Sequence, residues 1–297
     1  MAGKQITRAT GTNWIGWALA VALLTTVAAR PAAPAEDVKP KPAAKPPEPK
    51  ANVVAGVATD ERGNVIAGGT VHVFIAGVAF QSGQRNEFTT EAGEDGRFEF
   101  EVPPGQWKVT AQVAREYNGR QYQVDLAPVD GKGPFVAQNS RAGIVRNFVW
   151  RLTGLRAGRE KGLSNSYYGV AVLLEDAQAF GPPASRIPAK YAGGKVVLRF
   201  APKGPLLDGT KIDPFEREFP TARFANPDTS NTHTLVDVPI GDYAVSARIV
   251  TAEGKDRPLK LTNTAEGGKD AAERVDVTFT QPSLGERVRD GRMVLSE

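Results

Sequence analysis

Catalysis and metal binding need nucleophilic, acidic or ligating side chains at defined spacings, and this sequence offers few of them. It contains two histidines, His72 and His233, and no cysteine. Neither histidine belongs to an H-x-H or H-x-x-E pattern, so a zinc site is not expected. The lack of cysteine excludes thiolate nucleophiles, disulfides and an anchor attached through cysteine. A G-x-S-x-G nucleophile motif is also missing.

The two pairs of adjacent carboxylates are better explained as turn residues than as catalytic or metal-binding residues. Glu94-Asp95 and Glu175-Asp176 lie among turn-forming residues, where acidic side chains bond to their own backbone. A calcium site at Asp95 or Asp208 is the alternative, but no D-x-D-x-D-G spacing supports it. We therefore expect no catalytic residue, no metal site and no cofactor.

The stretch REYNGRQYQV is the best candidate for ligand contact. Asn118-Gly119 predicts a tight hairpin turn with Tyr117 before it and Tyr122 after it, so at least one of these rings should be exposed. Exposed rings can stack on sugar faces, and polar neighbours can bond to sugar hydroxyls. The predicted ligand-binding residues are Arg115, Tyr117, Asn118, Arg120 and Tyr122. Alternatively, both tyrosines cover the edge of the sheet.

The N-terminus has the features of an export signal. Residues 1–13 carry Lys4 and Arg8 and no acid, and an apolar stretch of signal-peptide length follows from Trp14 to Ala29. We predict a signal peptide over 1–35, with an uncleaved membrane anchor as the alternative. The proline-rich residues 36–50 predict an extended linker, which acts as a semi-rigid spacer or has no specific role.

The charge distribution argues against nucleic-acid binding. The formal net charge is +4, from 37 basic and 33 acidic residues, and three of the basic residues precede Glu36, the first acid. The remaining chain is almost neutral, whereas nucleic-acid binding needs a concentrated basic surface.

After residue 51 the apolar residues alternate with a period of two. Val71, Val73 and Ile75 predict one buried strand face, and Trp107 and Val109 predict another. Turn signals such as Asp95-Gly96 separate these strands, in agreement with the 31 glycines and 22 prolines. The fold class is therefore all-β.

The strand pattern occurs twice, which predicts two tandem antiparallel β-sandwich modules. AGGTVHVFIA from Ala67 is repeated as AGGKVVLRFA from Ala192, and VPPGQWKVTAQV is repeated as VPIGDYAVSARI. Trp107 thereby aligns with Tyr243, and both should anchor a core. The second copy carries an insertion between the two blocks, which we place in KGPLLDGTKIDPFEREFPTARF (203–224).

These motifs resemble the carboxypeptidase regulatory-like domain, a transthyretin-like (prealbumin-like) sandwich. The matching residues are Gly56, Val57, Asp60, Gly63, Gly68 and Val71, then the stretches 94–98 and 102–107. The resemblance covers residues 51–155 well and 165–285 loosely. Ile66 stands where the family usually has proline, and the Asp60–Gly63 turn is not recognisable in the second copy. The resemblance implies an accessory, non-enzymatic module whose fold is similar to that of carbohydrate-binding domains.

The sequence thus predicts a signal peptide (1–35), a Pro/Lys/Ala-rich linker (36–50), a first sandwich (51–155) and a second, divergent sandwich (165–297). We expect a periplasmic, secreted or envelope protein without enzymatic activity that serves in binding, adhesion or spacing. Its partner would be a glycan or an envelope protein, and it would meet a membrane only through an uncleaved N-terminal segment. Glycan binding near Tyr117 and Tyr122 is the main alternative function, and an enzyme with an unrecognised site is the third.

Overall fold

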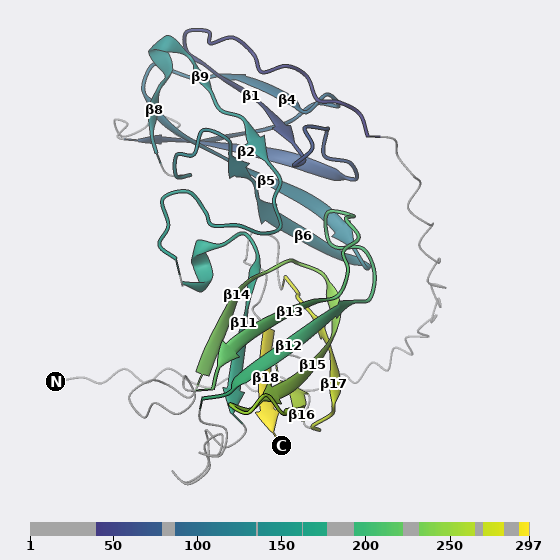
Figure 1. The fold of residues 1–297 in the computed structure, drawn as a ribbon. Coiled ribbons are helices and arrows are strands. Elements are labelled where there is room, and N and C mark those ends of the chain that lie inside the picture. The colour runs from purple at the N-terminus through teal and green to yellow at the C-terminus, as the bar shows by residue number, and fades with distance from the viewer. Residues whose placement is uncertain are drawn as a thin grey trace, which may run out of the picture. The chain divides into compact units, whose positions relative to one another are not determined.

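The computed structural model describes residues 40–78, 87–134, 136–161, 163–176, 193–221, 232–264, 270–281 and 291–296. The predicted signal peptide and residues 36–39 of the predicted linker lie outside this part of the chain. Residues 39–297 form one compact unit (Figure 1). No helix among the described residues is long and apolar enough to cross a membrane.

The first sandwich consists of two sheets. One has the strand order β4-β1-β10-β7, with β9 also paired to β1, and the other has the order β3-β2-β5-β6, with β8 also paired to β5. The strands are β1 (Val53–Thr59), β2 (Gly69–Val78), β3 (Glu87–Glu91), β4 (Arg97–Glu101), β5 (Gln106–Tyr117), β6 (Arg120–Asp125), β7 (Ala127–Pro128), β8 (Gln138–Asn139), β9 (Ile144–Val145) and β10 (Phe148–Val149).

The second sandwich repeats this arrangement. β14-β11-β18 corresponds to β4-β1-β9/β10, and β13-β12-β15 corresponds to β3-β2-β5. In both copies the first strand pairs antiparallel with the fourth and parallel with the last. The strands are β11 (Val170–Asp176), β12 (Lys195–Pro202), β13 (Phe215–Pro220), β14 (Thr232–Val238), β15 (Asp242–Val250), β16 (Asp256–Asn263), β17 (Arg274–Thr278) and β18 (Gly291–Ser296).

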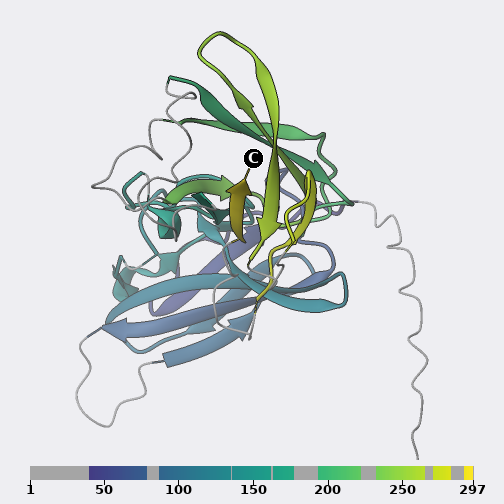
Figure 2. The same cartoon turned by 90° about the horizontal axis from the view of Figure 1, so that it is seen from below.

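Strand β16 links the two sheets of the second sandwich. Residues 256–259 pair with β15, and residues 260–263 pair with β18. The eight strands of this half therefore form one continuous hydrogen-bonded network. Figure 2 shows the blue strands of the first sandwich and the green to yellow strands of the second as separate groups.

The structure confirms the all-β fold class and the predicted alternation. Val71, Val73, Ile75, Trp107 and Val109 all have at most 6% of their surface exposed. The predicted Asp95-Gly96 turn forms, with Gly96 at φ +78° and the Asp95 carboxylate accepting the Arg97 N–H. Glu175 and Asp176, which the sequence placed in a turn, instead end strand β11. The domain boundaries 51–155 and 165–297 stay a prediction.

Trp107 and Tyr243 occupy equivalent positions. Both are fully buried, and each donates a hydrogen bond of 2.9 Å to the carbonyl four residues earlier, that of Pro103 or Pro239. Each ring also contacts a phenylalanine from the third strand of its copy. The ring centroids are 5.6 Å apart for Phe88 and Trp107 and 5.9 Å apart for Phe215 and Tyr243.

Gly56 in β1 has no space for a side chain. A Cβ at this position would lie 2.0 Å from the carbonyl oxygen of Arg146, in the short segment between β9 and β10, both of which pair with β1. Any side chain would therefore force this segment away from β1.

The end of the predicted linker takes part in the first sandwich. Ala43 donates its N–H to the Gly63 carbonyl at 3.2 Å, Ala44 donates to Asp95 at 3.0 Å, and Pro42 forms a β-bridge with Asn64. The linker prediction missed this pairing because the backbone of residues 41–44 binds to turns, which the proline content does not reveal.

Candidate functional site at the junction between the sandwiches

The hairpin predicted to contact a ligand is formed by β5 and β6. Asn118 has φ 49° and Gly119 has φ 73°, the two positive values that a tight type I′ turn requires. Arg120 at its second strand is exposed to solvent. The hairpin contacts the second sandwich, and this contact defines the junction.

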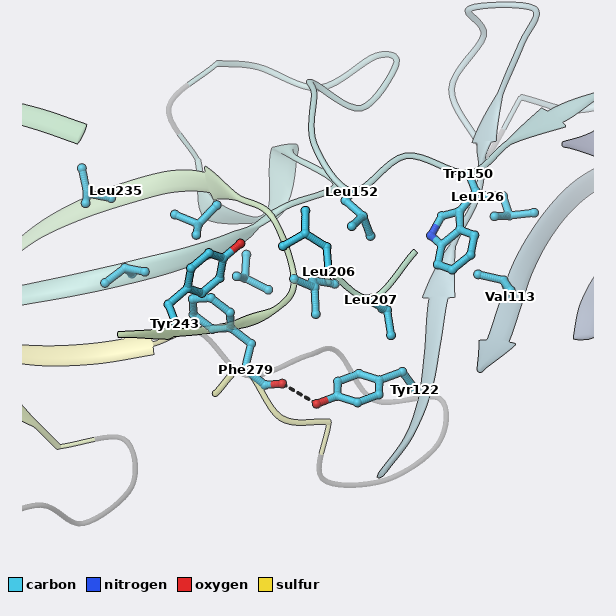
Figure 3. Packing of buried hydrophobic residues seen from close by; sticks show 14 of the residues in the cluster. Val113, Tyr122, Leu126, Trp150, Leu152, Leu206, Leu207, Leu235, Tyr243 and Phe279 are labelled. Carbon is cyan, nitrogen blue, oxygen red and sulfur yellow. Dashed lines mark hydrogen bonds between the residues drawn. The ribbon is translucent and has the colours of Figure 1, made fainter. Parts of the chain in front are cut away.

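Tyr122 lies inside the junction. Only 1% of its surface is exposed, and its hydroxyl donates a 2.7 Å hydrogen bond to the carbonyl of Phe279, the residue that follows β17 (Figure 3). Burial raises the pKa of Tyr122 above its ordinary value, because the phenolate would be desolvated.

Tyr117 bonds to two segments of the second sandwich. Its hydroxyl donates to the Pro205 carbonyl at 2.9 Å and accepts the Asp242 N–H at 3.3 Å. Its ring meets Tyr122 edge to face, with centroids 5.9 Å apart. Burial is the main cause that raises the pKa of Tyr117, and the Asp242 carboxylate adds to it.

Two amide side chains complete the polar contacts. Asn118 donates to the Asp242 carboxylate at 2.5 Å. Gln281 accepts the N–H of Gln123 at 2.5 Å and donates to the Gln123 carbonyl at 3.1 Å, so its amide binds the edge of β6 as a neighbouring strand would.

Arg115 borders the junction. It donates to the Ala67 carbonyl at 3.1 Å, and its guanidinium lies 5.5 Å from the centroid of the Trp150 ring. Burial lowers the pKa of Arg115, while the Asp208 carboxylate opposes this effect. Arg115 therefore faces the loop that carries Asp208, in the second sandwich.

Apolar side chains fill the space behind these bonds. Figure 3 shows Leu152, Leu206 and Leu207 between Tyr243 and Phe279 on one side and Trp150 and Tyr122 on the other. These residues belong to a single buried cluster that includes the cores of both sandwiches. Leu207 is fully buried and Leu206 is 4% exposed. The apolar core is therefore continuous across the junction.

The connection between the sandwiches is fixed by two charged side chains. Asp237, at φ 65°, accepts the Gly154 N–H at 2.8 and 2.9 Å and the Gly169 N–H at 3.3 Å. Arg156 bonds to the Asp125 carboxylate at 2.5 Å and to the Tyr167 carbonyl at 2.8 Å. Both ends of the connecting segment are thus held by side-chain bonds.

The structure brings four of the five predicted ligand residues into the junction or to its border. Arg120 is exposed, and its guanidinium lies near enough to the Tyr122 hydroxyl to oppose the rise in the pKa of Tyr122. The exposure assumed for the tyrosines is not observed, because Tyr122 is buried and Tyr117 is half-buried. This arrangement is close to the alternative in which both rings cover the sheet edge. Ligand contact by these five residues stays a prediction.

Sequence reasoning missed the residues on the other side of the junction: Pro205, Leu206, Leu207, Asp242, Phe279 and Gln281. The first three lie in the predicted insertion, between β12 and β13. The adjacent leucines of KGPLLDG were the available signal, since a pair of leucines in a turn-rich insertion needs a surface on which to be buried.

The described residues contain no cluster of three or more metal-ligating side chains. Nδ1 of His72 lies 3.3 Å from the carboxylate of Glu91 on the neighbouring strand. The other histidine, His233, pairs with Leu174 in the β11–β14 ladder. A hollow of about 510 Å³ lies at the ends of β12, β13 and β15, lined by residues 193–195, 218–220 and 250–252.

No protein-family model and no curated protein matches the chain. Solved structures show distant likenesses. A streptococcal ancillary pilin has 10% identity and a TM-score of 0.23, covering 81% of this chain and 62% of its own. A C-terminal fragment of the pilus adhesin SpaC from Lactobacillus rhamnosus GG has 11% identity and a TM-score of 0.23, covering 83% and 95%. The major pilin from Streptococcus pyogenes has 9% identity and a TM-score of 0.19, covering 84% and 97%. Scores of this size carry no conclusion about function.

Proposed function

We propose that this chain is an exported, non-catalytic envelope protein whose two sandwiches act as one rigid binding or spacing module. The observation that supports this best is the continuous apolar core at the junction. Two domains joined by a flexible linker would move independently, whereas a shared core holds their binding surfaces at a fixed separation.

The charged and polar groups of the junction also favour a structural role. Asp237, Tyr117 and Tyr122 each bond to backbone groups of a segment far along the chain, and Arg156 bonds to the nearby Tyr167 carbonyl. Each of these groups is therefore engaged in a bond that holds the structure together. An active site would need such groups directed at a common point where a substrate can bind.

We further propose that the chain is a divergent, duplicated member of the carboxypeptidase regulatory-like group. The strand order, the parallel pairing of the first and last strands and the Pro-x-Gly turn followed by an aromatic residue all occur twice. Accessory modules of this kind act through a partner surface.

Cell fractionation of the full chain in a bacterial host tests export. We expect the protein in the envelope or the medium, shortened at the N-terminus by about the length of a signal peptide, or retained with the full N-terminus in the membrane fraction. Full-length protein found only in the cytoplasm would contradict the proposal.

Calorimetry of residues 39–297 tests the rigid module. The shared core should give a single cooperative unfolding transition. Two well-separated transitions would show that the sandwiches are independent and would remove the spacing function.

Glycan binding at the hairpin is the second candidate, supported by exposed Arg120 and Asn118 at its tip. A glycan array with the unmodified chain and an Arg120→Ala variant tests it. Loss of a signal in the variant would support this site, whereas equal signals would exclude it.

A further inference from the structure

Two loops carry the exposed large apolar side chains of the described residues. Val129 is 60% exposed, Val136 42%, Leu155 39% and Leu163 55%. The valines lie in the loop 129–136 that follows β7, and the leucines lie in the loop 155–163 that precedes the second sandwich. Singly scattered exposed aliphatic residues are common in folded proteins, whereas exposed apolar residues that gather in one place often mark an interaction site.

The two loops are in direct contact. A Cβ placed on Gly133 would lie 3.3 Å from the Ala157 carbonyl oxygen, and one placed on Gly158 would lie 3.8 Å from the Gly133 Cα. The two loops therefore touch at Gly133 and residues 157–158, and we name their exposed sides together the apolar loop surface.

A buried arginine fixes the first loop. Arg146 is 0% exposed, and its guanidinium donates to the Lys132 carbonyl at 3.2 Å, to the Gly133 carbonyl at 2.8 Å and to the Val109 carbonyl at 3.0 Å. Burial of a cation is costly unless it is well bonded, so these contacts hold the loop firmly against the sandwich.

The second loop is closed at its base. Leu155 forms a β-bridge with Tyr167, and Arg156 donates its N–H to the Ser166 carbonyl at 2.7 Å. The Arg156 guanidinium also lies 4.6 Å from the centroid of the Tyr168 ring. Both loops thus display their apolar side chains from a fixed backbone, as a preorganised binding surface would.

The charges beside these side chains are mainly positive. Lys132, Arg159 and Lys161 are exposed, whereas the acidic residues of the two loops are Asp130 and Glu160. The Asp130 carboxylate lies 3.8 Å from Nε of the buried Arg146, so part of its charge is balanced within the protein. Aliphatic side chains bordered by cations fit a surface that is anionic outside and apolar beneath.

We propose that the apolar loop surface docks onto an anionic lipid bilayer, with the leucines and valines entering the acyl boundary and the cations meeting headgroup phosphates. This inference rests on the proposed envelope location and adds a partner to it. It differs from the predicted N-terminal anchor, because it assigns membrane contact to the folded unit itself.

Vesicle flotation of residues 39–297, the compact unit without the N-terminal apolar stretch, tests the inference directly. We expect binding to vesicles of phosphatidylcholine mixed with phosphatidylglycerol, weak binding to phosphatidylcholine alone, and release by high salt. No binding to the mixed vesicles, or equal binding to both kinds, would overturn the proposal. Capture of an envelope protein without vesicle binding would also overturn it, in favour of a protein partner.

Two double variants separate the apolar from the charged contribution. Leu155→Ser with Leu163→Ser should lower the partition coefficient by at least about ten-fold, and the unfolding temperature should fall only slightly, because Leu155 is 39% and Leu163 55% exposed. Lys132→Gln with Lys161→Gln, both at exposed positions, should weaken binding only to the anionic vesicles. The charge-matched control is Arg62→Gln with Lys255→Gln, also at exposed positions, which should bind normally.

Unchanged binding of the leucine variant, or an equal loss in the control, would refute the assignment to this surface. The vesicle result can be distinguished from the export result. A chain that stays in the cytoplasm contradicts the proposed export, whatever its affinity for lipid. An exported chain that does not bind vesicles contradicts only the proposed membrane contact.

Discussion

The turns before Trp107 and Tyr243 are built alike but meet different surroundings. In both, the aromatic side chain is buried and bonds to the proline carbonyl four residues before it. In the first sandwich, Pro103 and Pro104 are exposed. In the second, Asp242 beside the turn binds Asn118 and Tyr117 of the first sandwich.

This difference originates in the insertion between β12 and β13. Leu206 packs against the second turn so closely that a Cβ on Gly241 would lie 2.8 Å from its Cδ2 atom, and Pro205 accepts the Tyr117 hydroxyl. The duplicated motif therefore maintains each sandwich, while residues outside the motif create the contact between the two.

Truncation of either aromatic anchor should have the largest effect. Trp107→Ala and Tyr243→Ala should each lower the free energy of unfolding by about 3–5 kcal/mol, because each leaves a large cavity in a core. Urea unfolding followed by circular dichroism measures the change. A loss below about 1 kcal/mol in one variant only would break the equivalence of the two sandwiches.

Leu207→Ala should distinguish the junction from the cores. Removal of this buried side chain should lower the free energy of unfolding by about 2–5 kcal/mol. It should also split the calorimetric transition into two, because it removes apolar contacts from the part of the core that the two sandwiches share. Leu174→Ala, at a fully buried position in β11, is the matched control and should keep one transition. Two transitions in the control would contradict the prediction that Leu207 in particular couples the unfolding of the two sandwiches.

The two junction tyrosines should differ when their hydroxyls are removed. Tyr122→Phe leaves the buried Phe279 carbonyl without its hydrogen-bond donor and should lower the free energy of unfolding by about 1–3 kcal/mol. Tyr117→Phe removes hydrogen bonds of a half-buried hydroxyl and should lower it by only about 0.5–1.5 kcal/mol. Chemical denaturation measures both losses, and the reverse order would contradict the junction geometry.

The smallest expected effect is that of raising the pH, which should lower the free energy of unfolding by weakening the contacts of the junction. Burial raises the pKa of Tyr117 and Tyr122 above their ordinary value of 10.0, so their contribution to stability is full below pH 10 and declines as the pH rises through the folded-state pKa values. Urea unfolding measured on either side of this value should show the decline. The double variant with phenylalanine at 117 and 122 should show a shallower pH dependence, and an equal one would assign the decline to other tyrosines.

Local patterns were sufficient to predict the all-β class and several of its strands and turns. The alternation around Val71 and Trp107 and the turn at Asn118-Gly119 depend on backbone geometry and on burial of one strand face, which adjacent residues encode. The repeated Pro-x-Gly-aromatic blocks also revealed the duplication. The hydrogen bonds from Trp107 and Tyr243 to the prolines were not predicted, since they depend on how each side chain turns within its core.

The candidate site was predicted less well, because its character depends on what covers it. The sequence located the hairpin but not its partner, and Pro205, Phe279 and Gln281 lie far along the chain from Tyr117 and Tyr122. Arg146, between β9 and β10, was overlooked as well, since an isolated arginine usually faces solvent.

By itself, the sequence determined that the chain folds into β-sandwich copies with aromatic cores, because strand periodicity and turn chemistry act over a few residues. Only the tertiary structure decided that the tyrosine hairpin is covered, that the two cores are continuous and that exposed aliphatic residues gather on two touching loops. Burial depends on the approach of segments more than 80 residues apart, such as Tyr117 and Pro205, and no local pattern encodes that approach.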